Sequence, residues 1–515
     1  MSFLSLLLLL LLFSFLPLSL SQQQPPPPKG ILINCGATEE STIDDREWLP
    51  DTDFVSGGTS KNLTIPVTVP TLATVRSFPL RLHTKYCFVV EVFRSAKYVI
   101  RTTYFYGGVN DGHGSPPVFD QMVDGTFWNV VNTTVDYANN AASYYEGVFV
   151  AQGKTMSLCI GSNKYTDSDP FISALEFLIV GDSLYNTTDF GNFSLSLVAR
   201  NSFGYSGPII QYPDDQFDRF WEPSRDNDST VSENRNISVS GFWNVPPLKV
   251  FEAALTTTKV QPLVLNWPPA SLPNSMYYIA LYFADDRNSS SRVFNISIND
   301  VPYYRTLNVT PAGACVFATR WPLRGPTKIT LTPAVGSDIG PLINAGEIFE
   351  VLDLGGRTAT RDVIGLSMVK KSLKNPPLVW NGDPCMPRQY SWSGITCSYG
   401  PRIRVISLNL TSMGLSGSLS PSIVNMTGLT NIWLGNNSLT GPIPDLSSLK
   451  MLETLHLEDN QFSGSIPSSL GDIEGLRELF LQNNNLTGTV PNNLKDKPGL
   501  NLRTSGNNFE SPPPS

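Results

Sequence analysis

The chain has 515 residues, which is enough for several domains. Its 36 Lys and Arg residues against 44 Asp and Glu residues give a net charge of −8, with no long run of either sign. Nucleic acids and anionic lipids bind clustered cations, so this composition argues against both as main partners. The 41 prolines and 39 glycines are spread along the chain, which favours a turn-rich, mainly β protein.

Residues 1–21 form an apolar run that ends in small residues, and residues 22–29 form a polar, proline-rich linker. This order predicts a secretory signal peptide cleaved near Ser21. The alternative is an uncleaved segment that holds the chain at the membrane, because no Lys or Arg precedes the run. No later run is long enough to cross a bilayer, and the proline-rich tail 510–515 lacks the hydrophobic end of a lipid-anchor signal. We therefore expect a secreted protein with no transmembrane helix in the mature chain.

Asn-x-Ser/Thr sequons support an extracellular location, because N-glycans are added to secreted chains. The thirteen predicted glycosylation sites are Asn62, Asn132, Asn186, Asn192, Asn227, Asn236, Asn288, Asn295, Asn308, Asn409, Asn425, Asn436 and Asn485.

The six cysteines fit the same compartment. Cys385 and Cys397 are close in sequence and are expected to form a disulfide. The other four can pair in three ways, and the sequence does not choose among them; they are Cys35, Cys87, Cys159 and Cys315. There is no CxxC pair, and the three histidines are far apart in sequence, so we expect no metal site and no cofactor.

Two motifs recur between residues 30 and 360. Asp45-Arg46-x-Trp48 is repeated as Asp218-Arg219-x-Trp221, and Pro170-x-Ile-x-Ala-x-Glu176 is repeated as Pro341-x-Ile-x-Ala-x-Glu347. The two motifs are 125 residues apart in the first copy and 123 in the second. We infer two homologous lobes, at about 30–200 and 201–360. Their short aromatic and β-branched runs predict antiparallel β-sandwiches.

Residues 361–403 are expected to cap a repeat array. Asp362 precedes apolar residues at helical spacing and is a candidate helix cap. The segments Trp380-Asn-Gly-Asp-Pro-Cys385 and Trp392-Ser-Gly-Ile-Thr-Cys397 then close a small disulfide loop.

Residues 404–509 carry the repeats themselves. Asn437, Asn460, Asn484 and Asn507 recur at steps of 23, 24 and 23 residues. The first three are each preceded by a Leu-x-Leu-type segment and followed by Gly-x-Ile/Val-Pro. This period is that of leucine-rich repeats, in which leucines fill the coil and each buried Asn satisfies backbone groups of a tight turn.

These residues, with Ile33-Asn-Cys-Gly36, Tyr104-Phe-Tyr-Gly-Gly108 and Tyr212-Pro-Asp-Asp215, resemble the plant malectin-like ectodomain. From Gly30 to Phe509 the chain is similar to the extracellular half of malectin-like, leucine-rich-repeat receptor kinases, and closer to relatives without a kinase. The resemblance implies a mainly β protein with two tandem malectin-like β-sandwich lobes followed by a short leucine-rich repeat solenoid. It also implies a location in the apoplast or cell wall.

Two surfaces are candidate ligand sites. Malectin binds glucose disaccharides through aromatic and acidic residues, and the segment most similar to its sugar site contains Tyr104, Tyr106, Asn110 and Asp111. The alternative, which we favour, is that both tyrosines pack at a sheet end and Asn110-Asp111 makes a turn.

On the repeats, the outward positions of successive strands predict a ladder of Trp433, His456 and Phe480, flanked by Asn431, Glu458, Glu478 and Gln482. Such a ladder is a candidate protein-binding strip, although these positions would carry some side chain in any case. The paired Asp-Arg motifs occur in both lobes, which favours a structural role over ligand binding.

No catalytic motif is present. Gly153-Lys154-Thr155 lacks the spacing of a phosphate loop, and no pair of carboxylates is nominated for glycoside hydrolysis. We therefore expect a non-catalytic recognition protein that binds a cell-wall oligosaccharide, a secreted peptide or a receptor-kinase ectodomain. The alternatives are a carbohydrate-active enzyme and a passive structural protein of the wall.

Overall fold

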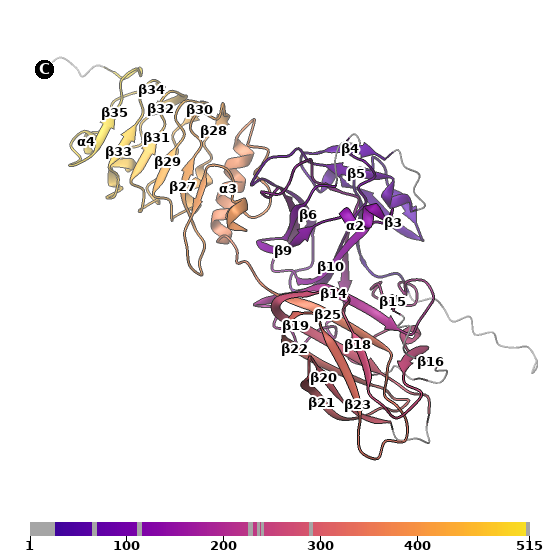
Figure 1. The fold of residues 1–515 in the computed structure, drawn as a ribbon. Helices are drawn as coiled ribbons and strands as arrows, with labels where there is room; N and C mark the ends of the chain where they lie inside the picture. The colour runs from indigo at the N-terminus through magenta and orange to yellow at the C-terminus, as the bar shows by residue number, and fades with distance from the viewer. Residues whose placement is uncertain are drawn as a thin grey trace, which may run out of the picture.

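A computed structural model describes residues 26–63, 69–110, 116–224, 230–233, 237, 241–287 and 292–510. The predicted signal peptide, the first part of the linker and the end of the tail lie outside this range. Two β-sandwich lobes adjoin one another, and a solenoid extends away from the first of them (Figure 1). We call residues 30–180 lobe 1 and residues 193–353 lobe 2. The predicted fold class is confirmed.

One eleven-stranded sheet runs through both lobes. Its strands, in spatial order, are β2 (Ser41–Ile43), β3 (Arg46–Pro50), β1 (Gly30–Asn34), β13 (Ala174–Val180), β7 (Lys97–Tyr104), β10 (Ser143–Val150), β14 (Phe193–Phe203), β25 (Ala345–Asp353), β19 (Leu272–Phe283) and β22 (Ala314–Gly325), with β15 (Glu222–Ser224) beside β14. The lobes join where β10 pairs with β14, with Gly147 opposite Ser196 and Val148 opposite Leu195.

Each lobe completes its sandwich with a second four-stranded sheet. In lobe 1 this sheet contains β6 (Lys85–Glu91), β11 (Thr155–Gly161), β8 (Phe119–Val123) and β9 (Thr126–Val131). In lobe 2 it contains β18 (Leu263–Asn266), β23 (Lys328–Pro333), β20 (Val293–Ile298) and β21 (Val301–Asn308). Separate apolar cores fill the two sandwiches, and a third core lies between the lobes around Tyr185, Trp221 and Tyr278.

The repeated motifs occupy equivalent positions in the two lobes. The Pro-x-Ile-x-Ala-x-Glu motif forms β12 (Phe171–Ile172) and β13 in lobe 1, and β24 (Leu342–Ile343) and β25 in lobe 2. β12 pairs with β5 (Thr74–Ser77), which also pairs with β4 (Thr59–Asn62), and β24 pairs with β17 (Ala253–Thr256), which also pairs with β16 (Thr230–Glu233). The Asp-Arg motif lies at or just before the start of a short strand, β3 in lobe 1 and β15 in lobe 2. Each of these strands pairs in parallel with the first strand of its lobe, β3 with β1 and β15 with β14. The lobes are therefore two copies of one plan.

The solenoid has two sheets. One contains β26 (Ile395–Cys397), β27 (Val405–Asn409), β29 (Asn431–Trp433), β31 (Thr454–His456), β33 (Glu478–Phe480) and β35 (Asn501–Arg503). The other contains β28 (Ser416–Ser418), β30 (Ser438–Pro442), β32 (Gln461–Ser465) and β34 (Asn485–Thr487). The strands of both sheets are parallel, except that β26 pairs antiparallel with β27. Leucines and isoleucines from every coil form one continuous core. The helices of the described chain are α2 (Thr134–Ala138), α3 (Thr360–Ser372) and α4 (Asn492–Lys495), and none of them is long and apolar enough to span a membrane.

The repeat asparagines, of which Asn460 is buried and the other three are half-buried, connect successive coils. The side-chain oxygen of Asn460 accepts from Leu439 N at 3.0 Å, and its amide donates to Leu434 O at 2.9 Å, both in the preceding coil. Asn437, Asn484 and Asn507 make the equivalent bonds, with Leu415, Phe462 and Leu486 as donors. A coil therefore depends on its neighbour to satisfy its backbone, as the repeat pattern predicts.

Helix α3 covers the open end of the first coil, but Asp362 does not cap it. The helix begins at Thr360, and the Asp362 carboxylate is fully buried. It accepts hydrogen bonds from Arg404 Nε and Val405 N, each at 2.8 Å, at the start of β27. Asp362 thus fixes the cap to the first repeat.

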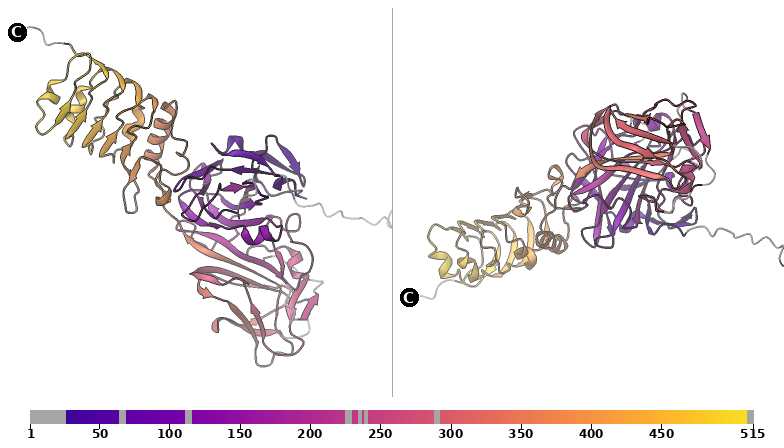
Figure 2. Two further views of the ribbon diagram at one scale, coloured as in Figure 1. Left: turned by 45° about the horizontal axis from the view of Figure 1, so that its top comes forward. Right: turned by 90° about the horizontal axis from the view of Figure 1, so that it is seen from below.

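The cap also contacts lobe 1, and the solenoid extends away from this contact (Figure 2). Lys85 Nζ donates to Asp383 O at 2.6 Å, and Tyr390 OH donates to Asp120 Oδ2 at 2.7 Å. A β-carbon on Gly382 would lie only 2.6 Å from the sulfur of Cys87. Only glycine therefore lets the cap approach the Cys87–Cys159 disulfide so closely.

Candidate ligand-binding surfaces

The predicted aromatic ladder exists on the solenoid. In the parallel register Trp433 lies opposite His456, His456 opposite Phe480, and Phe480 opposite Arg503. The rings of His456 and Phe480 are stacked with centroids 4.1 Å apart, and Trp433 meets His456 edge-on at 6.4 Å. All three rings are partly exposed.

Polar groups surround the ladder. His456 Nε2 lies 3.1 Å from a carboxylate oxygen of Glu478, and the Arg503 guanidinium lies 4.2 Å from the centre of the Phe480 ring. Asn409 occupies the position before Trp433 in the same row, and it is exposed. We call this row, from Asn409 to Arg503, the ladder strip. It offers apolar faces, both signs of charge and hydrogen-bonding groups together, as a protein-binding surface requires.

The tyrosines of the predicted sugar site are buried. Tyr104 is 0% exposed, and its hydroxyl donates to Gln121 Oε1 at 2.8 Å. Burial raises the pKa of the Tyr104 hydroxyl well above its ordinary value. Tyr106 is 1% exposed and packs edge-on against Tyr137 at 5.0 Å. Neither ring offers a face to a sugar, which fits the packing alternative.

The other two residues of that segment give the site little support. Asn110 is half-buried, and its amide donates weakly to Asp169 O at 3.4 Å. Asp111 lies outside the described residues. The three described residues, Tyr104, Tyr106 and Asn110, therefore do not form an open site.

The repeated Asp-Arg motifs meet at the seam between the lobes. Arg46 Nη1 lies 2.7 Å from Asp218 Oδ2, and Arg101 Nη1 lies 3.2 Å from the same oxygen. Glu146 bridges the lobes, with Arg101 of lobe 1 at 3.0 Å and Arg200 of lobe 2 at 2.8 Å. Burial alone would raise the pKa of Glu146, but Arg200 and Arg101 outweigh it, so the pKa is lowered. This carboxylate stays ionised, and it holds the lobes together.

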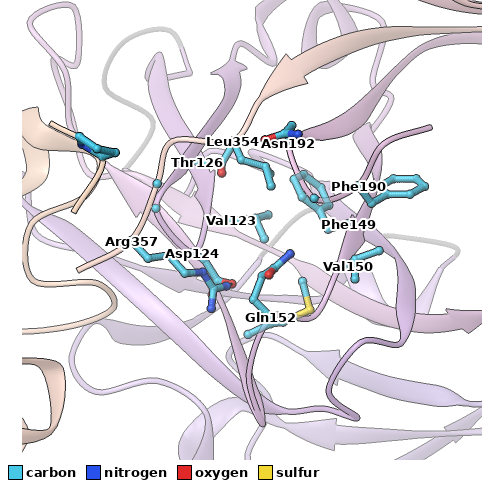
Figure 3. A pocket seen from close by; sticks show the side chains of 15 residues that line it. Val123, Asp124, Thr126, Phe149, Val150, Gln152, Phe190, Asn192, Leu354 and Arg357 are labelled. Atoms are coloured by element: carbon cyan, nitrogen blue, oxygen red, sulfur yellow. The ribbon is translucent and has the colours of Figure 1, made fainter. Parts of the chain in front are cut away.

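No sequence motif marks the pocket shown in Figure 3. Residues of lobe 1 line most of it, together with residues 190–192 of the loop between the lobes, the segment that follows lobe 2, and Pro401 of the cap. Its volume is about 570 Å³. Apolar side chains such as Phe149, Phe190 and Leu354 form part of its wall, together with polar Gln152 and Asn192. Asp124 and Arg357 form an ion pair at its edge.

Glycines bring the chain together beside this pocket. A β-carbon on Gly355 would lie 2.1 Å from Gly125 O, and one on Gly125 would lie 2.4 Å from Gly356 O. The segment that follows β25 therefore crosses the β8–β9 turn in backbone contact. The adjacent glycines Gly355 and Gly356, between lobe 2 and the cap, could have indicated this contact from the sequence. Residues without a β-carbon allow two backbone segments to approach closely.

The cysteines and sequons fit the expected compartment. Cys385 and Cys397 form a disulfide, and Cys87 pairs with Cys159 across β6 and β11, which leaves Cys35 and Cys315 as thiols. Ten sequon asparagines fall within the described residues, and none of these is buried. Asn227, Asn236 and Asn288 lie outside them. In the described part of the chain no group of three or more His, Cys, Asp or Glu side chains is arranged to hold a metal ion.

Known proteins share this architecture. The malectin-like domain family matches residues 33–351, and the leucine-rich repeat family matches residues 451–473 and 475–496. A leucine-rich repeat receptor-like serine/threonine-protein kinase of Arabidopsis thaliana, At2g14510, is 32% identical over 423 residues, 78% of this chain and 47% of its own. A probable kinase of the same class, At1g67720, is 30% identical over 480 residues, 84% of this chain and 48% of its own. The chain thus spans about half the length of the curated relatives it matches.

Solved structures agree at the level of the fold. The extracellular domain of ANXUR2 from Arabidopsis thaliana is 15% identical with a TM-score of 0.53, over 63% of this chain and 96% of that one. A structure of the plant peptide RALF23 in complex with FER and LLG2 matches with 17% sequence identity and a TM-score of 0.52. The match covers 63% of this chain and 96% of that one. The twin lobes, the repeats and these matches together show that the chain belongs to the malectin-like domain family, and that it combines this domain with leucine-rich repeats.

Proposed function

We propose that this chain is a non-catalytic recognition protein of the plant apoplast, and that the ladder strip binds a secreted peptide or the ectodomain of a receptor kinase. The observation that carries the proposal is the in-register row of partly exposed rings, Trp433, His456 and Phe480. Aromatic side chains at the centre of an interface commonly supply most of its binding energy.

The lobes support a recognition role rather than catalysis. Glu146, a buried carboxylate of the seam, is paired with Arg101 and Arg200, at 3.0 and 2.8 Å. A general acid for glycoside hydrolysis needs a carboxyl that holds a proton near neutral pH, and a paired arginine opposes that. Among the solved structures of similar fold, FER is seen in complex with a peptide, RALF23. A wall oligosaccharide has less support as the ligand, because Tyr104 and Tyr106 are buried.

The test is a binding screen of the glycosylated protein against co-secreted ectodomains and secreted peptides, followed by titration with variants. Trp433→Ala and Phe480→Ala should each weaken binding about tenfold or more, the range of an interface hot spot. Gln461→Ala and Ser465→Ala alter exposed residues of β32, in the opposite sheet, and should leave binding unchanged. Equal affinity of all four variants would exclude the ladder strip. Reproducible cleavage of wall oligosaccharides would instead favour the enzyme.

A further inference from the structure

The pocket beside the loop that joins the lobes has one of the predicted glycosylation sites in its wall. Asn192 lines the pocket and is exposed, and Asn192-Phe-Ser194 is a sequon. A glycan attached there would begin inside the rim of the pocket. The other described sequon of this loop, Asn186, is also exposed but does not line the pocket.

The turn that carries Asn192 is rigid. Asn192 N and Phe193 N both donate to Asp189 O, at 3.1 and 2.9 Å. Asp189 Oδ2 accepts from the Asn192 side-chain amide at 2.7 Å, which uses one of its two N–H bonds and leaves the other position for a sugar. Leu354 N donates to Asn192 O at 2.9 Å, so the turn also binds the segment that leads to the cap. The first sugar would leave the turn in a fixed direction at little entropic cost.

The wall of the pocket suits a sugar. Phe190 precedes Asn192 by two residues and lines the same pocket, where an aromatic ring can pack on sugar C–H groups. Lys97 Nζ lies 5.1 Å from the centre of the Phe190 ring and holds it in place. Gln152 supplies an amide for hydroxyl groups, while Asp124 and Arg357 neutralise each other. The volume of about 570 Å³ is within the range of roughly 300–1,000 Å³ for small-ligand pockets.

From these observations we infer that the pocket binds the chain's own N-glycan, with the sugars nearest Asn192 packed against Phe190. The occupant is a neutral N-acetylhexosamine core attached to this chain, and the pocket is closed to free ligands. The packed sugars connect the Asp189–Asn192 turn to the segment between lobe 2 and the cap. The inference is independent of the ladder strip.

The experiment measures how fast an endoglycosidase releases each glycan from the folded protein, made in a glycosylating host and followed by glycopeptide mass spectrometry. The Asn192 glycan should be released about tenfold more slowly than the Asn186 glycan, the factor that ~1.4 kcal/mol of contact energy gives. In Phe190→Ala and Phe190→Leu, release at Asn192 should accelerate to the rate at Asn186. Release at Asn186 in the same molecules reports any general unfolding, since that rate should not change.

Three results would overturn the inference. One is the absence of a glycan at Asn192 in the secreted protein. Another is release at Asn192 as fast as at Asn186 in the unaltered chain. The third is slow release that neither Phe190 variant accelerates, because the ring would then make no contact with the sugar.

Discussion

Arg46 of lobe 1 binds Asp218 of lobe 2 at 2.7 Å, so the two copies of one repeated motif contact each other across the seam. Asp45 and Asp218 share a left-handed backbone, with φ of 58° and 54°. Their environments differ, because Asp45 is exposed while Asp218 is 2% exposed and also binds Arg101. The duplication kept the turn in both lobes, but the first copy serves the seam through its arginine, Arg46, and the second through its aspartate, Asp218.

The seam should be sensitive to loss of a single charge. Glu146→Gln would leave Arg101 and Arg200 buried without the carboxylate that neutralises both, which should lower the free energy of unfolding by about 3–5 kcal/mol. Urea denaturation followed by tryptophan fluorescence measures this change. Asp300→Asn removes an exposed partner of Lys328 and should have little effect, since surface ion pairs contribute little. Similar midpoints for the two variants would contradict this account of the seam.

The asparagine row should dominate the stability of the solenoid. Asn460→Ala removes one accepted bond, from Leu439 N, and donated bonds to Leu434 O, Leu457 O and Glu458 O. Because buried backbone groups would lose their partners, we expect a loss of about 3 kcal/mol. Asn493→Ala removes one exposed bond, to Ser468 O, and serves as the matched control. Circular dichroism during urea denaturation distinguishes the two, and equal losses would argue against a cooperative row.

The contact between lobe 1 and the cap should depend on pH. Burial lowers the pKa of Lys85 from 10.5 to about 8, against the smaller opposite effect of Asp383. Between pH 8 and 10.5 the unfolded chain binds more protons at this residue, so the free energy of unfolding should rise with pH across this window. Below about pH 8 both states bind the proton at Lys85, so this contribution no longer changes with pH. Between pH 8 and 10.5 the free energy of unfolding of the unaltered protein should rise by about 3 kcal/mol relative to that of Lys85→Met. Urea denaturation curves at several pH values measure this difference. Parallel curves for the two proteins would mean that Lys85 is not perturbed.

A glycan at Asn409 should limit access to the ladder strip. Asn409 lies opposite Trp433 in the parallel register. Thr411→Ala removes the sequon of Asn409 but keeps the hydrogen bond from the backbone N–H of residue 411 to the Asn409 side chain. We expect a faster association rate with the strip's ligand, because a bulky glycan beside Trp433 would be lost. Thr487→Ala, which removes the Asn485 sequon from the opposite sheet, should leave the rate unchanged. Surface plasmon resonance measures both rates, and a slower Thr411→Ala variant would show that the glycan takes part in binding.

Periodic and repeated features could be predicted from the sequence, because they reflect local rules. The Leu-x-Leu and Asn spacing fixed the direction in which Trp433 and Phe480 point, since alternate residues of a strand face opposite sides. The duplicated motifs likewise predicted the twin lobes.

Features that depend on how distant segments meet could not be predicted. Tyr104 resembled a sugar-contacting residue, yet Gln121 and the surrounding rings bury it. The pocket near Asn192 is formed by segments more than 200 residues apart in the chain, including Asp124 and Leu354, and no local pattern encodes their contact. The partner of Cys87 followed only from the pairing of β6 with β11.

Strand β10 of lobe 1 pairs with β14 of lobe 2, so a single sheet continues from one lobe into the other. Neither lobe is therefore expected to fold as an independent domain. Separating the lobes would expose two unpaired strand edges, which attract other chains. It would also break the ion pairs that cross the seam, Glu146–Arg200 and Arg101–Asp218. Fragments produced by cutting the chain between the lobes, within residues 181–192, should be insoluble when expressed alone. The same two fragments, when co-expressed, have the surfaces needed to reassemble.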